Sequence, residues 1–219
     1  APAPVVLPAE AVDQRLGELT GSGAEQREGQ RLYAREVASI FAPRPDRGKP
    51  QLLLAQAGTG IGKTLGYLAP ASLWAQAAQG TVWVSTYTRN LQRQLKAEAA
   101  RAWPDRREDG SRPVVVRKGR ENYLCLLNLE DALEGGNGGG FGGRAAVLAQ
   151  LVARWAAYSQ DGDMIGGDLP GWLGTLFRSR AIRSLTDQRG ECIYAGCPHY
   201  RKCFIERAGR AARKADIVI

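Results

Sequence analysis

Short apolar runs alternate with amphipathic segments through the first half of the chain. Runs rich in apolar and β-branched residues, typical of strands, occupy 51–57, 81–85, 113–117 and 216–219. Apolar residues recur at helical spacing over 11–19, 25–41, 63–74 and 89–102. Strands that alternate with helices favour a mostly parallel, doubly wound sheet, so the pattern predicts an α/β fold. In the second helical segment we expect Leu32, Val37, Ile40 and Phe41 to face inward.

The pattern changes after Lys118. No further strand is expected before Asp216, and helices are predicted over 145–158 and 169–177. We therefore expect a mainly helical insertion that returns to the sheet at the last strand. The predicted organisation is a lead-in, the first part of a sheet domain, the insertion and the return to the sheet, at 1–24, 25–117, 118–205 and 206–219.

The composition and the net charge exclude few classes of protein. Hydrophobic residues make up 44% of the 219 residues, which is usual for a globular core. No apolar run reaches the roughly 18 residues of a membrane-spanning helix, and no signal peptide is visible. The formal net charge of +8 suits a polyanionic partner, although many proteins carry such a charge without one. The only methionine is Met164 and the chain ends on a predicted strand, so we expect an excerpt of a longer polypeptide.

The most informative motif follows the first predicted strand directly and precedes a predicted helix. It consists of Ala57, Gly58, Thr59, Gly60, Ile61, Gly62, Lys63 and Thr64. Glycines between a strand and a helix let backbone N–H groups close around a di- or triphosphate, and the helix N-terminus adds its dipole. Lys63 would reach the β- and γ-phosphates, and Thr64 would place its hydroxyl on Mg²⁺. The motif predicts an ATP·Mg²⁺ site; the alternative is a glycine-rich surface turn.

Four cysteines form a second candidate site. Cys125 is distant in sequence, whereas Cys192, Cys197 and Cys203 are clustered. Without a secretion signal, four thiols are better interpreted as metal ligands than as disulfides. A zinc site usually shows two closely spaced pairs, whereas one distant cysteine with a cluster of three is closer to the ligation of a [4Fe–4S] cluster. A zinc site and unligated buried thiols remain alternatives at this point.

The order of the motifs resembles a known family. The phosphate-binding motif is followed by three further segments and the cysteine cluster, and the segments are 85–95 (STYTRNLQRQL), 118–125 (KGRENYLC) and 212–219 (ARKADIVI). This order closely resembles the DinG/XPD family of iron–sulfur DNA helicases, best its bacterial DinG-like branch, from about Glu25 to the last residue. The resemblance implies a RecA-like motor domain, interrupted by an iron–sulfur insertion, that couples ATP hydrolysis to DNA unwinding. It also implies that the four cysteines hold a [4Fe–4S] cluster.

The resemblance also carries over individual residues. Arg27 and Gln30 match the adenine-reading segment upstream of the phosphate loop; an amide can pair with an adenine edge. Thr86, Thr88 and Gln92 lie in the segment that contacts single-stranded DNA, although Thr88 is also a candidate N-cap. The expected DNA contacts in the segment before the first cysteine are Arg120 and Tyr123. Tyr123 could stack on a base, but packing against the cluster is the role that we favour for its ring.

Other family features are missing from the chain. No Asp-Glu pair occurs, so the acidic DEAH-type box is absent, as are the second motor domain and its arginine. Gln56 and Ile61 also depart from the family pattern. The resemblance implies single-stranded and forked DNA as partners, no membrane, a monomer and a cytoplasmic, nucleoid-associated location. The alternatives are a zinc-bearing P-loop ATPase and a nucleic-acid-binding module without helicase activity.

Overall fold

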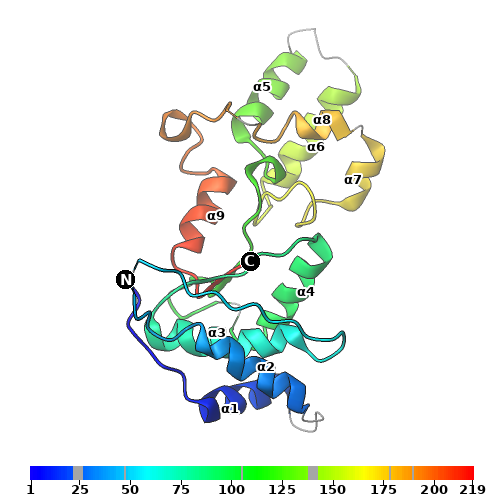
Figure 1. Ribbon diagram of the computed structural model, residues 1–219. Helices are drawn as coiled ribbons and strands as arrows, with labels where there is room; N and C mark the ends of the chain where they lie inside the picture. The colour runs from blue at the N-terminus through cyan, green and yellow to red at the C-terminus, as the bar shows by residue number, and fades with distance from the viewer. Residues whose placement is uncertain (22–26, 47, 105, 138–142, 178, 189) are drawn as a thin grey trace. The chain divides into compact units, whose positions relative to one another are not determined.

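The computed structural model describes residues 1–219 except 22–26, 47, 105, 138–142, 178 and 189 (Figure 1). The chain divides into two compact units. Unit 1 comprises Ala1–Val116 with Ala211–Ile219, and unit 2 comprises Arg117–Arg210. None of the helices in the described ranges combines the length and apolar composition needed to cross a bilayer.

Unit 1 contains a small parallel sheet and its helices. The helices are α1 (Ala9–Thr20), α2 (Glu28–Ser39), α3 (Lys63–Ala78) and α4 (Arg89–Ala99), and the strands are β1 (Val82–Trp83), β2 (Val114–Val115) and β3 (Ile217–Val218). The strand order is β1-β3-β2, and both pairings are parallel. Ile217 and Val218 of the central strand are fully buried, as expected for a parallel strand covered on both faces. The α/β class and the parallel sheet are thus confirmed.

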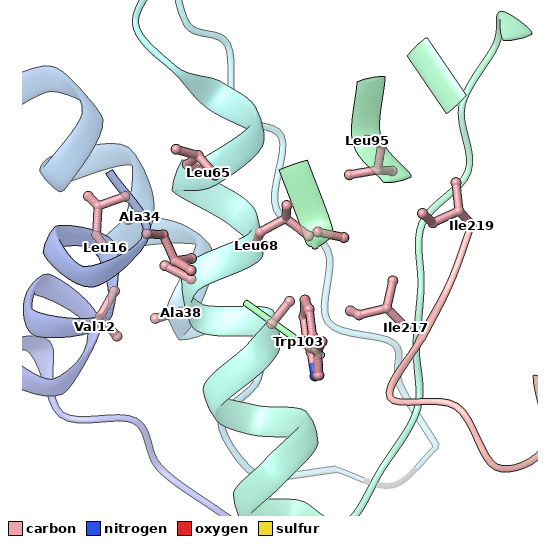
Figure 2. Close-up of a cluster of buried hydrophobic side chains, with 14 residues drawn as sticks. Val12, Leu16, Ala34, Ala38, Leu65, Leu68, Leu95, Trp103, Ile217 and Ile219 are labelled. Atoms are coloured by element: carbon pink, nitrogen blue, oxygen red, sulfur yellow. The ribbon is translucent and has the colours of Figure 1, made fainter. Parts of the chain in front are cut away.

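Helix α3 lies at the centre of the core of unit 1. Leu68 and Ala69 are fully buried in it, and α1 contributes Val12 and Leu16 to the same cluster (Figure 2). A helix that is apolar on most of its circumference must be covered on several sides. Helices α1 and α2 supply part of this cover, and Ile217 of the central strand belongs to the same cluster.

The inward face of α2 differs from the prediction. Its buried residues are Gln30, Ala34 and Ala38, which are spaced four apart, whereas Leu32 is exposed. Small alanines let α2 approach α3 closely, and this approach decides the face more strongly than the size of the apolar side chains. The prediction for Leu32 is therefore wrong.

The predicted strand over 51–57 is also not formed. These residues have no regular secondary structure, and Leu52 and Leu54 are 81% and 88% exposed. A strand requires hydrogen bonds to a neighbour, and the sheet of the described residues consists of β1, β3 and β2, none of which pairs with 51–57. The apolar run has the composition of a strand, but no strand of the sheet is hydrogen-bonded to it.

Unit 2 is mainly helical. Its helices are α5 (Leu126–Asn137), α6 (Arg144–Ala156), α7 (Gly171–Leu176) and α8 (Ser179–Arg183), with two short 3₁₀ turns, η1 (Arg120–Asn122) and η2 (Tyr194–Gly196); α9 (Phe204–Ala212) contains the boundary between the units. Its core cluster includes Leu124, Leu148 and Val152. Two isolated antiparallel bridges, Tyr123 with Asp163 and Leu124 with Thr186, are the strand-like pairings among its described residues.

Candidate functional site

The glycine-rich segment forms a turn that leads directly into α3. Gly60 and Gly62 have φ angles of 81° and 82°, in the left-handed region that favours glycine. Gly62 is the N-cap, and the helix begins at Lys63. Because the first N–H groups of a helix have no partner within it, this turn presents backbone donors at the positive end of a sixteen-residue helix.

The side chain of Lys63 folds back across this turn. Its Nζ donates to the carbonyl oxygens of Ala57 at 3.1 Å and Gly58 at 2.7 Å. The neighbouring Thr64 hydroxyl is hydrogen-bonded to Tyr67, the pKa of which is raised by burial. The cation thus lies over the loop, and the hydroxyl lies at the start of the helix, where a phosphate ligand and its metal ion would be expected.

The structure brings Arg27 and Gln30 to the same loop. Arg27 Nη1 donates to the carbonyl of Gly60, and Gln30 Nε2 donates to the carbonyl of Gly62 at 2.8 Å. Gln30 is only 6% exposed, so its amide supports the loop from inside unit 1. A Cβ at Gly62 would lie 2.2 Å from Gln30 Nε2. Gly62 is therefore required for its φ angle and for the close approach of this amide.

The segment that follows β1 carries the predicted contacts to single-stranded DNA. Thr88 is the N-cap of α4, and its Oγ1 accepts from the N–H of Leu91 at 3.2 Å. The capping role of Thr88 is therefore confirmed. The hydroxyl of Thr86 lies 3.5 Å from the Thr88 carbonyl oxygen, and Gln92 is half-buried in the first turns of α4.

In unit 2, Tyr123 does not have the geometry of a base-stacking residue. It is 4% exposed, lies in the core cluster, and its hydroxyl accepts from the N–H of Lys118 at 3.1 Å. Burial raises its pKa. A ring enclosed in this way has no free face for a base, which agrees with the packing role favoured for Tyr123.

Arg120 lies nearby but is engaged within unit 2. Its Nε donates to Asp187, and its guanidinium lies 5.0 Å from the centre of the Tyr194 ring. Lys118 is likewise paired with Asp163, which is buried. The segment before Cys125 is thus anchored by two carboxylates, Asp163 and Asp187, that sequence reasoning did not find, because no motif marks them.

The four cysteines line one cavity of unit 2. Its other walls are mainly apolar and aromatic, and they include Leu126, Leu127, Tyr194, Tyr200 and Ile205. Cys125 and Cys203 directly precede α5 and α9, while Cys192 and Cys197 flank η2. All four thiols are free and half-buried.

Backbone N–H groups lie against two of these sulfurs. The sulfur of Cys192 accepts from the N–H of Tyr194 at 3.3 Å, and Cys125 accepts from backbone N–H groups of Leu127 and Asn128. Burial has the larger effect on Cys125 and raises its pKa. A bound cation would offset this burial, because a coordinating thiol is deprotonated.

Thiolates are ligands for both a zinc ion and an iron–sulfur cluster, so the donor set alone suits either. Among the described residues, no three Cys, His, Asp or Glu side chains converge closely enough to hold one metal ion. Zinc requires four ligands at about 2.0–2.3 Å from one centre. Each thiolate of a [4Fe–4S] cluster binds a different iron, so such a cluster requires four cysteines around one cavity, and the four cysteines line one.

One polar pair on this cavity was not anticipated. His199 lines it together with the cysteines, and its Nε2 lies 2.9 Å from Oε2 of Glu130 on α5. The sequence gives no signal for this pair, because the two residues are 69 positions apart.

Comparisons with known proteins agree with the motif order. No protein-family model matches the chain. The chain is 33% identical over 201 residues to the ATP-dependent DNA helicase YoaA of Escherichia coli, covering 90% of the chain and 28% of that protein. It is 34% identical over 212 residues to the ATP-dependent helicase DinG of Mycobacterium tuberculosis, a match that covers 90% of the chain and 30% of that protein.

A third relative carries a different activity in its name. The 3'-5' exonuclease DinG of Bacillus subtilis is 33% identical over 213 residues, which are 94% of the chain and 20% of that protein. The chain thus spans less than a third of the length of each of these relatives. Over the segment that it shares with them, the chain belongs to the DinG-like family.

Proposed function

We propose that this chain is the ATP-binding part of an ATP-dependent DNA helicase, with unit 1 as part of a RecA-like motor domain and unit 2 as an iron–sulfur domain. The observation that carries this proposal is the turn of Gly60 and Gly62 into α3, with Lys63 folded over it, in a chain similar to proteins named DinG and YoaA helicases. The remaining motor parts, the acidic box and second domain, belong to the whole protein.

On nucleotide binding, side chains of the loop would exchange their hydrogen bonds within the protein for contacts to the nucleotide and its metal ion. Lys63 Nζ would leave the carbonyls of Ala57 and Gly58 and reach the β- and γ-phosphates, while N–H groups at the start of α3 hold the phosphate oxygens. Thr64 would turn its hydroxyl from Tyr67 to Mg²⁺. Arg27 and Gln30 would read the base from the adjoining segment. These residues bind and align; the closing of the site requires the second motor domain.

In unit 2 we assign Cys125, Cys192, Cys197 and Cys203 as ligands of a [4Fe–4S] cluster. When bound, the cluster supplies four iron–thiolate bonds that tie the start of α5 to the segment 192–203. The protein contributes a mainly apolar cavity around the half-buried sulfurs and the N–H groups that lie against Cys125 and Cys192. Zinc remains the alternative, as one chelated ion with the same thiols.

The proposed nucleic-acid partner is single-stranded or forked DNA. Thr86, Gln92 and the capped end of α4 would contact backbone phosphates, because hydroxyls, amides and helix N-termini are common phosphate donors. Thr88 would serve in both roles, as a cap and as a neighbour of the phosphate. Arg120 would contact DNA only through the part of its guanidinium not engaged by Asp187.

The direct test is ATP hydrolysis by the whole protein with and without single-stranded DNA. We expect stimulation by DNA and loss of turnover in Lys63→Ala. Lys49→Ala is the matched control, because Lys49 is an exposed lysine whose Nζ lies 3.8 Å from Asp46, outside the glycine-rich turn. Turnover that persists in Lys63→Ala would refute the assignment of the nucleotide site. DNA binding without any hydrolysis would favour a binding module.

The cluster is tested separately by metal content. Anaerobically purified protein should be brown, with about four iron and four sulfide per chain. The iron should fall in Cys192→Ala and Cys203→Ala. Colourless protein with one zinc per chain would instead support the zinc-bearing ATPase.

A further inference from the structure

Tyr87 is the most exposed large hydrophobic residue in the described part of the chain. It is 98% exposed and lies between Thr86 and Thr88, just after β1 and before α4. Exposed positions alternate along this extended segment, with Ser85 and Tyr87 exposed and Val84 and Thr86 partly buried. Tyr87 lies at the bend between β1 and α4, and its ring is directed away from the core.

No local structural role accounts for this ring. A hydrophobic residue before an N-cap often packs against the fourth residue of the helix as a staple. Thr88 is the N-cap, so the corresponding partner of Tyr87 would be Gln92, which is polar. At 98% exposure the ring packs on nothing in unit 1.

The backbone around the ring is nevertheless held in place. The hydroxyl of Thr88 accepts from the N–H of Leu91 at 3.2 Å, and the N–H of Gln92 donates to the Thr88 carbonyl at 3.0 Å. On the other side, the N–H of Val84 donates to the carbonyl of Val218 at 2.8 Å. Tyr87 is thus presented from a short segment fixed at both ends.

The adjoining helix is basic on one face. Arg89, Arg93 and Lys96 are exposed and follow the i, i+4, i+7 spacing of a single helical face. The one carboxylate of α4, Glu98, is paired with Arg101 at 3.4 Å. A polyanion that meets this face would therefore meet cations and hydroxyls around an aromatic ring.

We propose that Tyr87 stacks on a base of single-stranded nucleic acid while the basic face of α4 holds the flanking phosphates. This inference rests on the proposed function and adds a residue to its DNA contact. Stacking of this kind tolerates any base, because every base has a π-face, which suits a motor that moves along varied sequence. The cations set affinity through released counterions, and the ring adds a contribution independent of salt.

The test is binding of a fluorescein-labelled oligothymidylate to the whole protein at several salt concentrations. Tyr87→Ala should weaken binding about 5- to 150-fold, the range of one lost aromatic stack, and leave the salt slope unchanged. Tyr87→Phe should bind as the unmodified protein does. Arg93→Gln should weaken binding and reduce the salt slope. Tyr158→Ala is the matched control, because Tyr158 is 84% exposed at the end of α6, and it should bind normally.

A second readout reports the stack itself. An oligonucleotide with 2-aminopurine should lose fluorescence on binding the unmodified protein and Tyr87→Phe, and less so on binding Tyr87→Ala. If the unmodified protein binds DNA and Tyr87→Ala matches it in both assays, the stacking role is refuted and the proposed function stands. If the unmodified protein binds no DNA, both are refuted.

Discussion

Three glycines of the nucleotide loop form a graded series that tests its geometry. Gly58 has ordinary φ and open space around its Cα. Gly60 has a φ of 81° with open space, so alanine there meets backbone strain alone. Gly62 has a φ of 82°, and an added Cβ would lie 2.2 Å from Gln30 Nε2. Alanine at Gly62 therefore meets strain and the displacement of an amide.

The magnitudes follow from these differences. Gly58→Ala should change the free energy of unfolding by no more than the roughly 0.4–1 kcal/mol that reduced freedom of the unfolded chain contributes. Relative to it, Gly60→Ala should lose about 1–2 kcal/mol for a left-handed alanine. The end of the Gln30 side chain can swing away from a new Cβ, so its displacement costs mainly the hydrogen bond to Gly62, about 0.5–1.5 kcal/mol. Gly62→Ala should then lose about 2–3 kcal/mol.

Urea denaturation of the four proteins, including the unmodified one, measures this series. A double variant separates the two contributions at Gly62: in a Gln30→Ala background, Gly62→Ala should lose only about as much as Gly60→Ala. If Gly60→Ala and Gly62→Ala lose equal stability in the protein that retains Gln30, the contact between Gln30 and the loop is refuted. A neutral Gly60→Ala would refute the left-handed turn.

Three further changes probe other parts of the fold. The hydrogen bond from Arg35, together with Arg31, lowers the pKa of Asp13 to about 2. The stability that the ionised carboxylate contributes is therefore complete above the pKa of Asp13 in the unfolded chain, and it is lost as the pH falls toward 2. The Tm difference between the unmodified protein and Asp13→Asn should shrink from about pH 6 to about pH 2.5. Asp216 accepts a hydrogen bond from the Trp103 indole at 2.9 Å and pairs with Arg107. Asp216→Ala should therefore lower the free energy of unfolding, measured with urea, by about 2–4 kcal/mol. The control Asp46→Ala, at an exposed carboxylate, should lower it by less than about 1 kcal/mol. A Cβ at Gly162 would lie 2.2 Å from the ring of Phe204, so Gly162→Ala should lower the Tm of unit 2 more than Gly174→Ala, which has open space.

The sequence predicted the start of α3 correctly. The order glycine, lysine, threonine followed by apolar residues marks a helix N-terminus after a turn, and the helix indeed begins at Lys63. The three strands around 82, 114 and 217 were also found, because each is an apolar, β-branched run near turn residues. Such local signals are sufficient where a segment and its neighbours in sequence determine its conformation.

The errors arose where a distant partner decides the outcome. The run at 51–57 has strand propensity, yet it pairs with none of the three strands of the described residues. Helix α2 turns Ala34 and Ala38 inward because the close approach of α3 favours small side chains over Leu32.

The cysteine site was predicted in part: its four cysteines could be found from the sequence, but the residues around them could not. The spacing of the four cysteines suggested a shared site, and the structure places all four around one cavity. The residues that shape this site, such as Glu130 against His199 and Asp187 against Arg120, come from distant segments and carry no motif. Pairings of this kind require the folded chain to be recognised.

The central claim is that ATP held by the loop of Gly60, Gly62 and Lys63 drives strand separation. The most direct measurement is displacement of a labelled strand from a forked duplex by the whole protein, with ATP and Mg²⁺, compared with Lys63→Ala and with ATP omitted. We predict displacement by the unmodified protein with ATP and none in the other two reactions. Displacement by Lys63→Ala at an undiminished rate would contradict the account.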